Sequence, residues 1–331
     1  MQLRAGCGPR GNFSRWSLAA SVLLAAVLFY WSVRGVEWRH VWEAILRARA
    51  GWLWCAAWIT TSSFVVRAFR WRILLNAEAR LGIGAVFQAN MVGYLGNNFL
   101  PARAGELLRS LLISRASSLS NTYVLTTALS ERLMDVVAVI LAAALALLAL
   151  RSKPAWMTDL SRGMAFAALA GAVAIAVLPR TGSLIDALIP RLPLPERIRK
   201  FLLSTADQVL LGVRAFHDWG RLAGFAALTA LIWSADGLGI IVGARSLGLA
   251  IPIPIAMLLL AAMALGSALP STPGYLGIYQ FAAVMVLGPA GIPRDEALAY
   301  SFLGQAVSYV VVAALGLPSL YGLQRGLKET G

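Results

Sequence analysis

Long segments without a charged side chain dominate the pattern of this chain. A membrane-crossing helix needs roughly 20 mostly apolar residues, and five uncharged runs approach or exceed that length: Trp16–Val33, Leu81–Ala102, Gly163–Pro179, Ser246–Pro293 and Ala297–Gln324. The run that begins at Ser246 is long enough for two passages or a hairpin. The pattern therefore predicts a polytopic integral membrane protein.

The predicted fold is all-α, with about six continuous transmembrane helices and two broken helices that dip into the bilayer and return. Apolar positions among charged neighbours at 36–49 predict a helix in the membrane interface. No linker separates a second domain, so 1–331 is expected to be a single transmembrane domain. The continuous helices are expected at 16–33, 51–66, 119–150, 163–179, 221–244 and 296–323, the broken segments at 83–115 and 254–291, and a cytoplasmic basic amphipathic segment at 183–217.

Composition and charge agree with a bilayer environment. Hydrophobic residues make up 59% of the 331 residues and charged residues 13%, whereas soluble domains are about 25% charged. The net charge of +14 is typical of basic loops that meet anionic headgroups. No nucleic-acid-binding module is recognisable, so nucleic acid is not an expected partner. Cys7 and Cys55 predict no disulfide framework, and neither a metal site nor a cofactor is expected.

The distribution of arginines favours an orientation with both termini in the cytoplasm. In this orientation the arginines that follow the helix at 51–66 are cytoplasmic anchors. Four arginines within 34–49 would lie outside, which weakens the assignment of the orientation. The expected anchors are Arg67, Arg70, Arg72 and Arg80.

The two broken segments resemble each other. Leu95–Leu107 aligns with Leu265–Leu276 after one residue is dropped, so that Leu-Gly, Leu-Pro, a later Gly and its Leu coincide. Pro and Gly interrupt helices, and non-helical backbone at membrane depth is tolerated only inside protein or beside a watery cavity. The match predicts an inverted repeat, with halves at 16–150 and 163–323, although a chance match of common residues remains the alternative.

Four motifs resemble the lysylphosphatidylglycerol synthetase transmembrane-region family, also called the flippase-like domain family. They occur in the family's order and cover most of the chain. They are Arg67-x-x-Arg70-Trp71-x-x-Leu74-Leu75, Asn98-x-x-Pro101-x-x-x-Gly105-Glu106-x-x-Arg109, Ser130-Glu131-Arg132-x-x-Asp135 and Pro270-x-x-Pro273-Gly274-x-x-Gly277. Tyr275 departs from the small residue expected after Gly274.

The resemblance implies a membrane fold with re-entrant segments, located in a bacterial cell (inner) membrane, and lipid translocation. Other members accompany genes of hopanoid or glycolipid synthesis, so a lipid or glycolipid biosynthetic enzyme is a possible partner beside the membrane lipids. The 331 residues contain no counterpart of the soluble domain that attaches lysine to phosphatidylglycerol. Lysyltransferase activity is therefore not expected.

Charged residues beside the first break are the strongest candidates for a binding site. Charge within hydrocarbon is costly and usually functional, and arginine binds phosphate bidentately. A static network of ion pairs that locks the broken segment is the competing interpretation, with nearly equal weight for Glu131, Arg132 and Asp135. The candidate substrate-binding residues are Asn97, Asn98, Pro101, Arg103, Gly105, Glu106, Arg109, Glu131, Arg132, Asp135, Pro270, Pro273, Gly274 and Gly277.

Three further residues are candidates for a headgroup or coupling role: Arg67, Arg70 and Asp236. For the two arginines, membrane-edge anchoring is the favoured interpretation. Asp236 is an isolated acid within a span, either a proton-coupling group or the partner of an arginine across the bundle. The second broken segment has only neutral polar groups, which suggests a path that is charged on the cytoplasmic side and neutral outside.

The leading functional hypothesis is translocation, between leaflets, of a phospholipid or lipid-linked precursor with an anionic or zwitterionic headgroup. The alternatives are an intramembrane lipid-modifying enzyme and an accessory subunit of a lipid or glycolipid pathway. No metal-binding, nucleophilic or phosphate-cradling motif of an enzyme is present in the sequence, so a transporter is favoured.

Overall fold

The computed structural model describes residues 11–100, 104–150, 155–177, 180, 189–191, 195–268 and 273–329. Within these ranges the regular structure is helical. Four helices are long and apolar enough to cross a membrane, at Asn121–Ala149, Met157–Val177, Trp219–Arg245 and Arg294–Leu323. The prediction of an all-helical, multi-pass membrane protein is thus confirmed.

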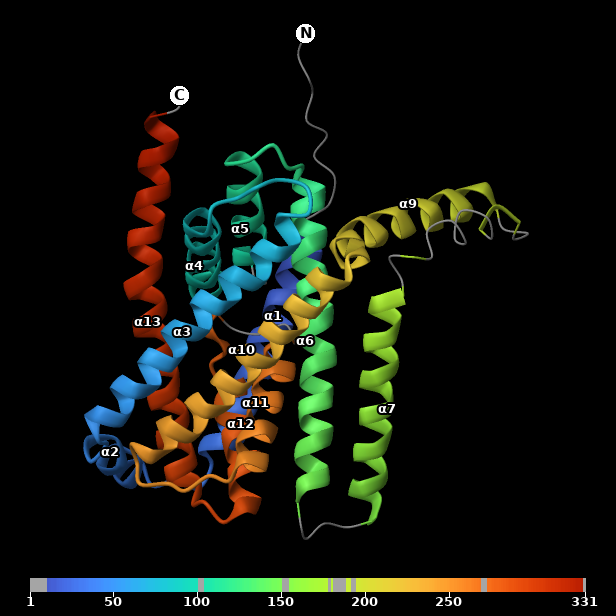
Figure 1. Cartoon of the computed structure of the whole chain (residues 1–331). Helices are drawn as coiled ribbons and strands as arrows, with labels where there is room; N and C mark the ends of the chain where they lie inside the picture. Colours follow the sequence, from blue (N-terminus) through green and yellow to red (C-terminus); the bar gives the residue numbers. More distant parts are fainter. Residues whose placement is uncertain are drawn as a thin grey trace.

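The first part of the chain runs through six helices. α1 (Gly11–Val33) crosses the bundle, α2 (Trp38–Leu46) lies across its far end, and α3 (Ala50–Leu75) returns (Figure 1). α4 (Ile83–Phe99) and α5 (Ala104–Arg115) are two shorter helices packed together, and both outer ends of this pair lie at the end of the molecule where α1 begins. α6 (Asn121–Ala149) then runs the full length of the bundle.

The second part has a similar sequence of long and short helices. α7 (Ala155–Val177) packs against α6, and α9 (Glu196–Val213) projects sideways between short turns at Ile189–Arg191 and Arg214–His217 (Figure 1). α10 (Trp219–Arg245) pairs with α3 along its length. α11 (Ile253–Ala268) and α12 (Ile278–Leu287) form the second pair of shorter helices, with turns at Pro273–Tyr275 and Gly288–Ala290, and α13 (Arg294–Glu329) closes the bundle.

The two pairs of shorter helices enter from opposite ends. The α11–α12 pair has its outer ends at the end of the molecule opposite to those of α4 and α5, and α13 finishes at the end where α1 begins (Figure 1). Within each expected broken segment one helix ends and another begins: α4 ends at Phe99 and α5 begins at Ala104, and α11 ends at Ala268 and α12 begins at Ile278.

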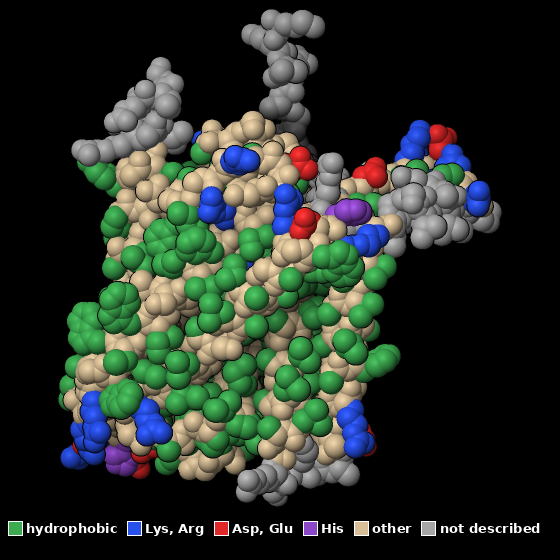
Figure 2. Space-filling model, viewed as in Figure 1, with side chains coloured by type: hydrophobic (Ala, Val, Ile, Leu, Met, Phe, Trp, Pro, Cys, Tyr) green, Lys and Arg blue, Asp and Glu red, His purple; other side chains and the backbone are tan. Residues whose placement is uncertain are grey.

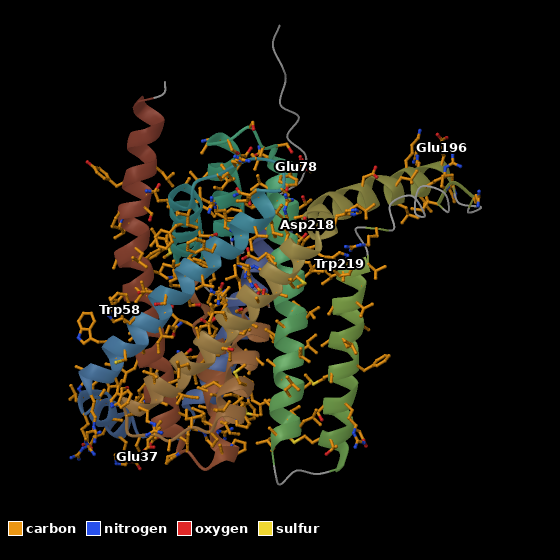
Figure 3. All side chains as sticks on the ribbon, viewed as in Figure 1. Glu37, Trp58, Glu78, Glu196, Asp218 and Trp219 are labelled. Atoms are coloured by element: carbon orange, nitrogen blue, oxygen red, sulfur yellow. The ribbon has the colours of Figure 1, made fainter. Side chains whose placement is uncertain are left out.

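Hydrophobic side chains form a broad belt between two charged ends. On the face seen in Figure 2, Lys, Arg, Asp and Glu gather at the top and bottom, and green apolar side chains cover the middle. Trp58, 72% exposed, points outward from α3 within this belt (Figure 3). An exposed apolar belt of this kind is suited to lipid contact.

Glycines explain the close approach of α4 and α5. A Cβ at Gly105 would collide with the carbonyl oxygen of Gly93 and with Asn97, and a Cβ at Gly96 would lie 3.0 Å from the Gly105 Cα. Because glycine has no side chain, the two backbones come into contact. The packing gained in this way offsets the loss of helix stability that glycine causes.

One expected boundary is wrong in a way that matters for the site. α3 continues to Leu75 instead of ending near residue 66, so Arg67 and Arg70 lie within the helix and not in a loop after it. Arg70 is 0% exposed. The interpretation of these two arginines as membrane-edge anchors is therefore incorrect, because carboxylates on neighbouring helices pair with them inside the bundle.

Candidate functional site

Arg70 is the innermost member of a buried network of charges. Its guanidinium donates to Glu131 Oε1 at 2.7 Å and to Asp135 Oδ1 at 2.6 Å, and its Nη1 also reaches the Thr229 hydroxyl at 3.3 Å. Glu131 and Asp135 are four residues apart on α6 and so share one helix face, as predicted. The planar guanidinium of Arg70 fits between the two carboxylates.

Arg109 on α5 extends the network. It pairs with Glu131 at 2.9 Å and with Glu106, three residues earlier on the same helix, at 2.6 Å. Asn90 Oδ1 accepts a further hydrogen bond at 2.8 Å, and the guanidinium lies 4.5 Å from the ring centroid of Trp71. Glu131 therefore joins two arginines, one from α3 and one from α5.

Arg132 connects this network to an internal cavity. It pairs with Glu106 and lies 3.5 Å from Asp135. Its side chain is 33% exposed, whereas those of Arg70 and Arg109 are 0% and 3% exposed. Arg132 is thus the arginine of the network that a molecule in the cavity can reach.

A second ion pair lies on the same cavity wall. Arg67 on α3 pairs with Asp236 on α10, and the Ser63 hydroxyl donates to Asp236 Oδ1 at 2.6 Å. Ser63 and Arg67 are one helical turn apart, which places both beside the same carboxylate. Asp236 is therefore the partner of an arginine across the bundle, which is one of the two interpretations that the sequence left open.

Among the described residues the charges of the site balance. Four arginines, at 67, 70, 109 and 132, contact four carboxylates, at 106, 131, 135 and 236. Neutrality reduces the cost of burying these groups. It also means that each of these arginines already has a carboxylate partner.

The cavity has a volume of about 510 Å³ and lies between the two broken segments. Charged residues line it from α3, α5, α6 and α10. Apolar residues of the same helices, among them Leu53, Val139 and Ile240, line another part of it. The cavity is therefore amphipathic: it has a charged part, an apolar part and tyrosines from the second broken segment. Tyr275 and Tyr279 stack there at 5.3 Å.

Several buried polar atoms on this wall have no hydrogen-bond partner among the residues that the structure describes. They are Asn97 Oδ1, Arg132 Nε, Trp233 Nε1 and Ser301 Oγ. Each of these atoms is closed to solvent, so they are polar groups packed into the wall and not groups that a molecule in the cavity contacts directly.

The second break is held by a neutral network. Gln280 donates to Gln305 Oε1 at 2.8 Å and accepts from the Gly277 backbone N–H at 2.7 Å. Gln305 and Tyr309 both donate to the Gly274 carbonyl oxygen, the latter at 2.7 Å. Gly274 and Gly277 have φ of 71° and 88°, a backbone region that favours glycine. These contacts fix the backbone of the break through neutral groups.

The predicted site residues fall into four groups. Asn97, Asn98, Glu106, Arg132, Asp135, Arg67 and Asp236 line the cavity. Behind its wall lie Arg70, Arg109, Glu131 and Gly105, while Gly274 and Gly277 belong to the neutral network. Pro101, Arg103 and Pro270 fall outside the described residues, and Pro273 is described only as part of the turn at the second break.

Sequence reasoning missed the neutral partners in both networks. Ser63, Asn90 and Thr229 contact the charges, and Gln305 and Tyr309 contact the second break. The sequence signal that could have identified these residues is a polar side chain inside an otherwise apolar helix. Ser63 and Asn90 also lie on the helices that carry motif residues, α3 with Arg67 and α4 with Asn98.

Together, the helical bundle, the apolar belt and the amphipathic cavity define a multi-pass membrane protein with buried, paired charges beside an internal cavity. The model of the family described as "Lysylphosphatidylglycerol synthase TM region" matches residues 18–316. The chain therefore belongs to this family.

One relative shares a similar stretch of sequence. The UPF0104 membrane protein MJ1078 of Methanocaldococcus jannaschii is 24% identical over 236 residues, which is 70% of this chain and 96% of the relative. No solved structure matches the chain.

Proposed function

We propose that this protein moves a phospholipid or lipid-linked precursor with a phosphate-bearing headgroup between the leaflets of a bacterial cell membrane. The observation that carries the proposal is the amphipathic cavity between the two broken segments, with Asn97, Asn98 and Arg132 on its described wall. A lipid headgroup needs polar contacts inside the bundle, while its acyl chains stay in hydrocarbon.

The charged part of the cavity suits a phosphate. Arg132 is the accessible arginine of the buried network, and Glu106, its partner, also contacts Arg109. A phosphate diester that takes a hydrogen bond from Arg132 therefore leaves Glu106 compensated. Asn97 and Asn98 from the end of α4 are positioned to add amide contacts.

The two pairs of shorter helices suit alternating access. In this proposal α4–α5 and α11–α12 are re-entrant segments of an inverted repeat, entering from the cytoplasmic and outer faces respectively, and both termini are cytoplasmic. Rocking of one half against the other exposes the cavity to each face in turn. The opposite directions of the two pairs in Figure 1 support this arrangement.

The test is leaflet transfer by the purified, reconstituted protein. Vesicles with fluorescent phospholipid in both leaflets are treated with dithionite, which bleaches only the outer leaflet. Translocation is expected to expose the inner-leaflet fraction in protein-containing vesicles faster than in empty ones. Equal bleaching in both, for anionic, zwitterionic and lipid-linked probes and under each imposed gradient, would overturn the proposal. A chemically altered lipid in the recovered extract would instead identify an enzyme.

A further inference from the structure

The Arg67–Asp236 pair differs from the other charges of the site in having no second ionic partner within the described ranges. Among the residues that the structure describes, Arg67 is the one ion-pair partner of Asp236, and the converse holds for Arg67. Their side chains are 15% and 20% exposed, and both line the cavity. Arg70 and Glu131, by contrast, are 0% and 2% exposed and each has more than one charged partner. The Arg67–Asp236 pair is therefore accessible from the cavity, and a ligand that binds Arg67 leaves Asp236 without a described cationic partner.

The other accessible pair behaves differently when an anion enters. If a phosphate takes Arg132, Glu106 keeps Arg109 at 2.6 Å and Asp135 keeps Arg70 at 2.6 Å. Each carboxylate beside Arg132 thus retains a cation. If a phosphate takes Arg67, the described partner that Asp236 keeps is the neutral hydroxyl of Ser63.

An unpaired carboxylate within a low-dielectric bundle is strongly disfavoured, and protonation removes its charge. We propose that Asp236 is a proton-binding site that couples the uptake of one proton to the binding of one lipid phosphate at Arg67; this inference rests on the proposed translocase function. The carboxylate of Asp236 accepts the proton and becomes a neutral acid, while the phosphate diester remains an anion paired with Arg67. The site gains one negative and one positive charge, so the loaded carrier keeps its neutrality.

The surroundings of Asp236 support this choice. α11, which packs against α10, carries no titratable residue in the described range Ile253–Ala268. The turn at Arg214–His217 contacts α10 at its beginning, far along the helix from Asp236. Among the residues that the structure describes, the remaining titratable or charged groups that line the same cavity are Arg67, Tyr94, Glu106, Arg132, Asp135, Tyr275, Tyr279 and Tyr300. Of the cations among them, Arg132 is occupied by Glu106 and Asp135.

Strict one-to-one coupling has a quantitative consequence. Because one proton accompanies each singly charged lipid, a membrane potential does no net work on the pair. A pH gradient does, and the equilibrium ratio of lipid between leaflets is expected to change up to about tenfold per pH unit. The lipid accumulates in the leaflet that faces the more alkaline solution.

The experiment uses the full chain in phosphatidylcholine vesicles with a trace of fluorescent phosphatidylglycerol and with pyranine as a pH dye in the lumen. Leaflet distribution and lumenal pH are followed after a pH step. Asp236→Asn keeps a hydrogen-bond acceptor for Ser63 but cannot exchange a proton. Asp218→Asn is the matched control, since Asp218 lies at the beginning of the same helix (Figure 3), where it caps the Arg221 N–H, and asparagine caps equally well.

Wild type and Asp218→Asn are expected to accumulate lipid on the alkaline side, with one proton moved per lipid, and Asp236→Asn to lose that accumulation. An even distribution in wild type under every pH gradient would overturn proton coupling and leave translocation intact. Accumulation that persists in Asp236→Asn would overturn Asp236 as the proton site. If Asp236→Asn does not fold, the pyranine signal of wild type still decides, and an absent proton flux overturns the inference. The absence of any translocation would overturn the proposed function itself.

Discussion

Arg70 on α3 and Glu131 on α6 are 61 positions apart in the sequence, yet they form a 2.7 Å ion pair. Both side chains are essentially inaccessible, at 0% and 2%. The pair therefore ties α3 to α6 in the interior of the bundle. Because Glu131 also holds Arg109 on α5, one carboxylate fixes the position of the first broken segment relative to the long helices.

Removal of Arg70 is expected to destabilise the fold strongly. Arg70→Ala leaves Glu131 and Asp135 without their shared cation, and breaking a buried ion pair by removing one partner costs about 3–5 kcal/mol. The free energy of unfolding, measured by SDS titration in mixed micelles, reports the loss. Arg39→Ala is the matched control: its side chain is 86% exposed and pairs with Glu43 on α2, and such pairs contribute at most about 1 kcal/mol. Equal effects of the two substitutions would contradict the buried role of Arg70.

Lysine is not expected to replace arginine at this position. Arg70 donates to Asp135 from both Nη1 and Nη2 and to Glu131 from Nη2, whereas an ammonium group is a compact charge that lacks the planar fork. Arg70→Lys should therefore unfold at an SDS concentration between those of wild type and Arg70→Ala. If Arg70→Lys is as stable as wild type, a positive charge alone is sufficient to stabilise Glu131 and Asp135, and the planar guanidinium is not needed.

The contact between α4 and α5 predicts a strong response to a single methyl group. A Cβ at Gly105 would collide with the Gly93 carbonyl oxygen, so Gly105→Ala is expected to destabilise the protein by about 1–3 kcal/mol through overpacking. A Cβ at Gly84, near the beginning of α4, would meet nothing within 4 Å among the described residues. Gly84→Ala should be neutral or stabilise by up to about 1 kcal/mol. The same SDS titration compares them, and a harmless Gly105→Ala would contradict the close packing.

Two glycines with positive φ allow the cost of backbone strain at the second break to be measured separately from the cost of a steric collision. Gly274 and Gly248 both have positive φ, at 71° and 78°, but a Cβ at Gly274 would collide with the Tyr309 hydroxyl, whereas one at Gly248 meets no described atom within 4 Å. Gly248→Ala should cost about 1–2 kcal/mol from backbone strain alone. Gly274→Ala should cost more, because it also displaces Tyr309 from the Gly274 carbonyl oxygen. Equal unfolding free energies for the two variants would argue against the Tyr309 contact.

The approximate positions of most helices and of both breaks could be predicted from local signals, although the end of α3 could not. Apolar runs mark the spans, and Pro with Gly marks the ends of α4 at Phe99 and of α11 at Ala268. Glu131 and Asp135 could also be placed on one face, since a spacing of four residues is sufficient for that. These properties depend only on neighbours along the chain.

Pairing across the bundle could not be predicted in the same way. Arg67 and Asp236 are 169 positions apart, and an arginine near the end of an apolar run has the same local pattern whether it anchors at the headgroups or is buried. The local pattern places Arg70 wrongly for this reason. Only the packing of α3 against α6 and α10 distinguishes the two cases.

Leaflet transfer in reconstituted vesicles, compared between Arg132→Gln and Arg162→Gln, tests the central claim most directly. Arg132 is the more exposed of the two described arginines that line the cavity, at 33% against 15% for Arg67, whereas the Arg162 side chain on α7 is 72% exposed and pairs with Asp159 on the same helix. A charged hydrogen bond contributes about 1.5–3 kcal/mol, so Arg132→Gln is expected to slow transfer by roughly 10-fold to 100-fold, and Arg162→Gln to leave it unchanged. Arg132→Gln protein that is folded and transfers lipid at the wild-type rate would contradict passage of the headgroup through this cavity.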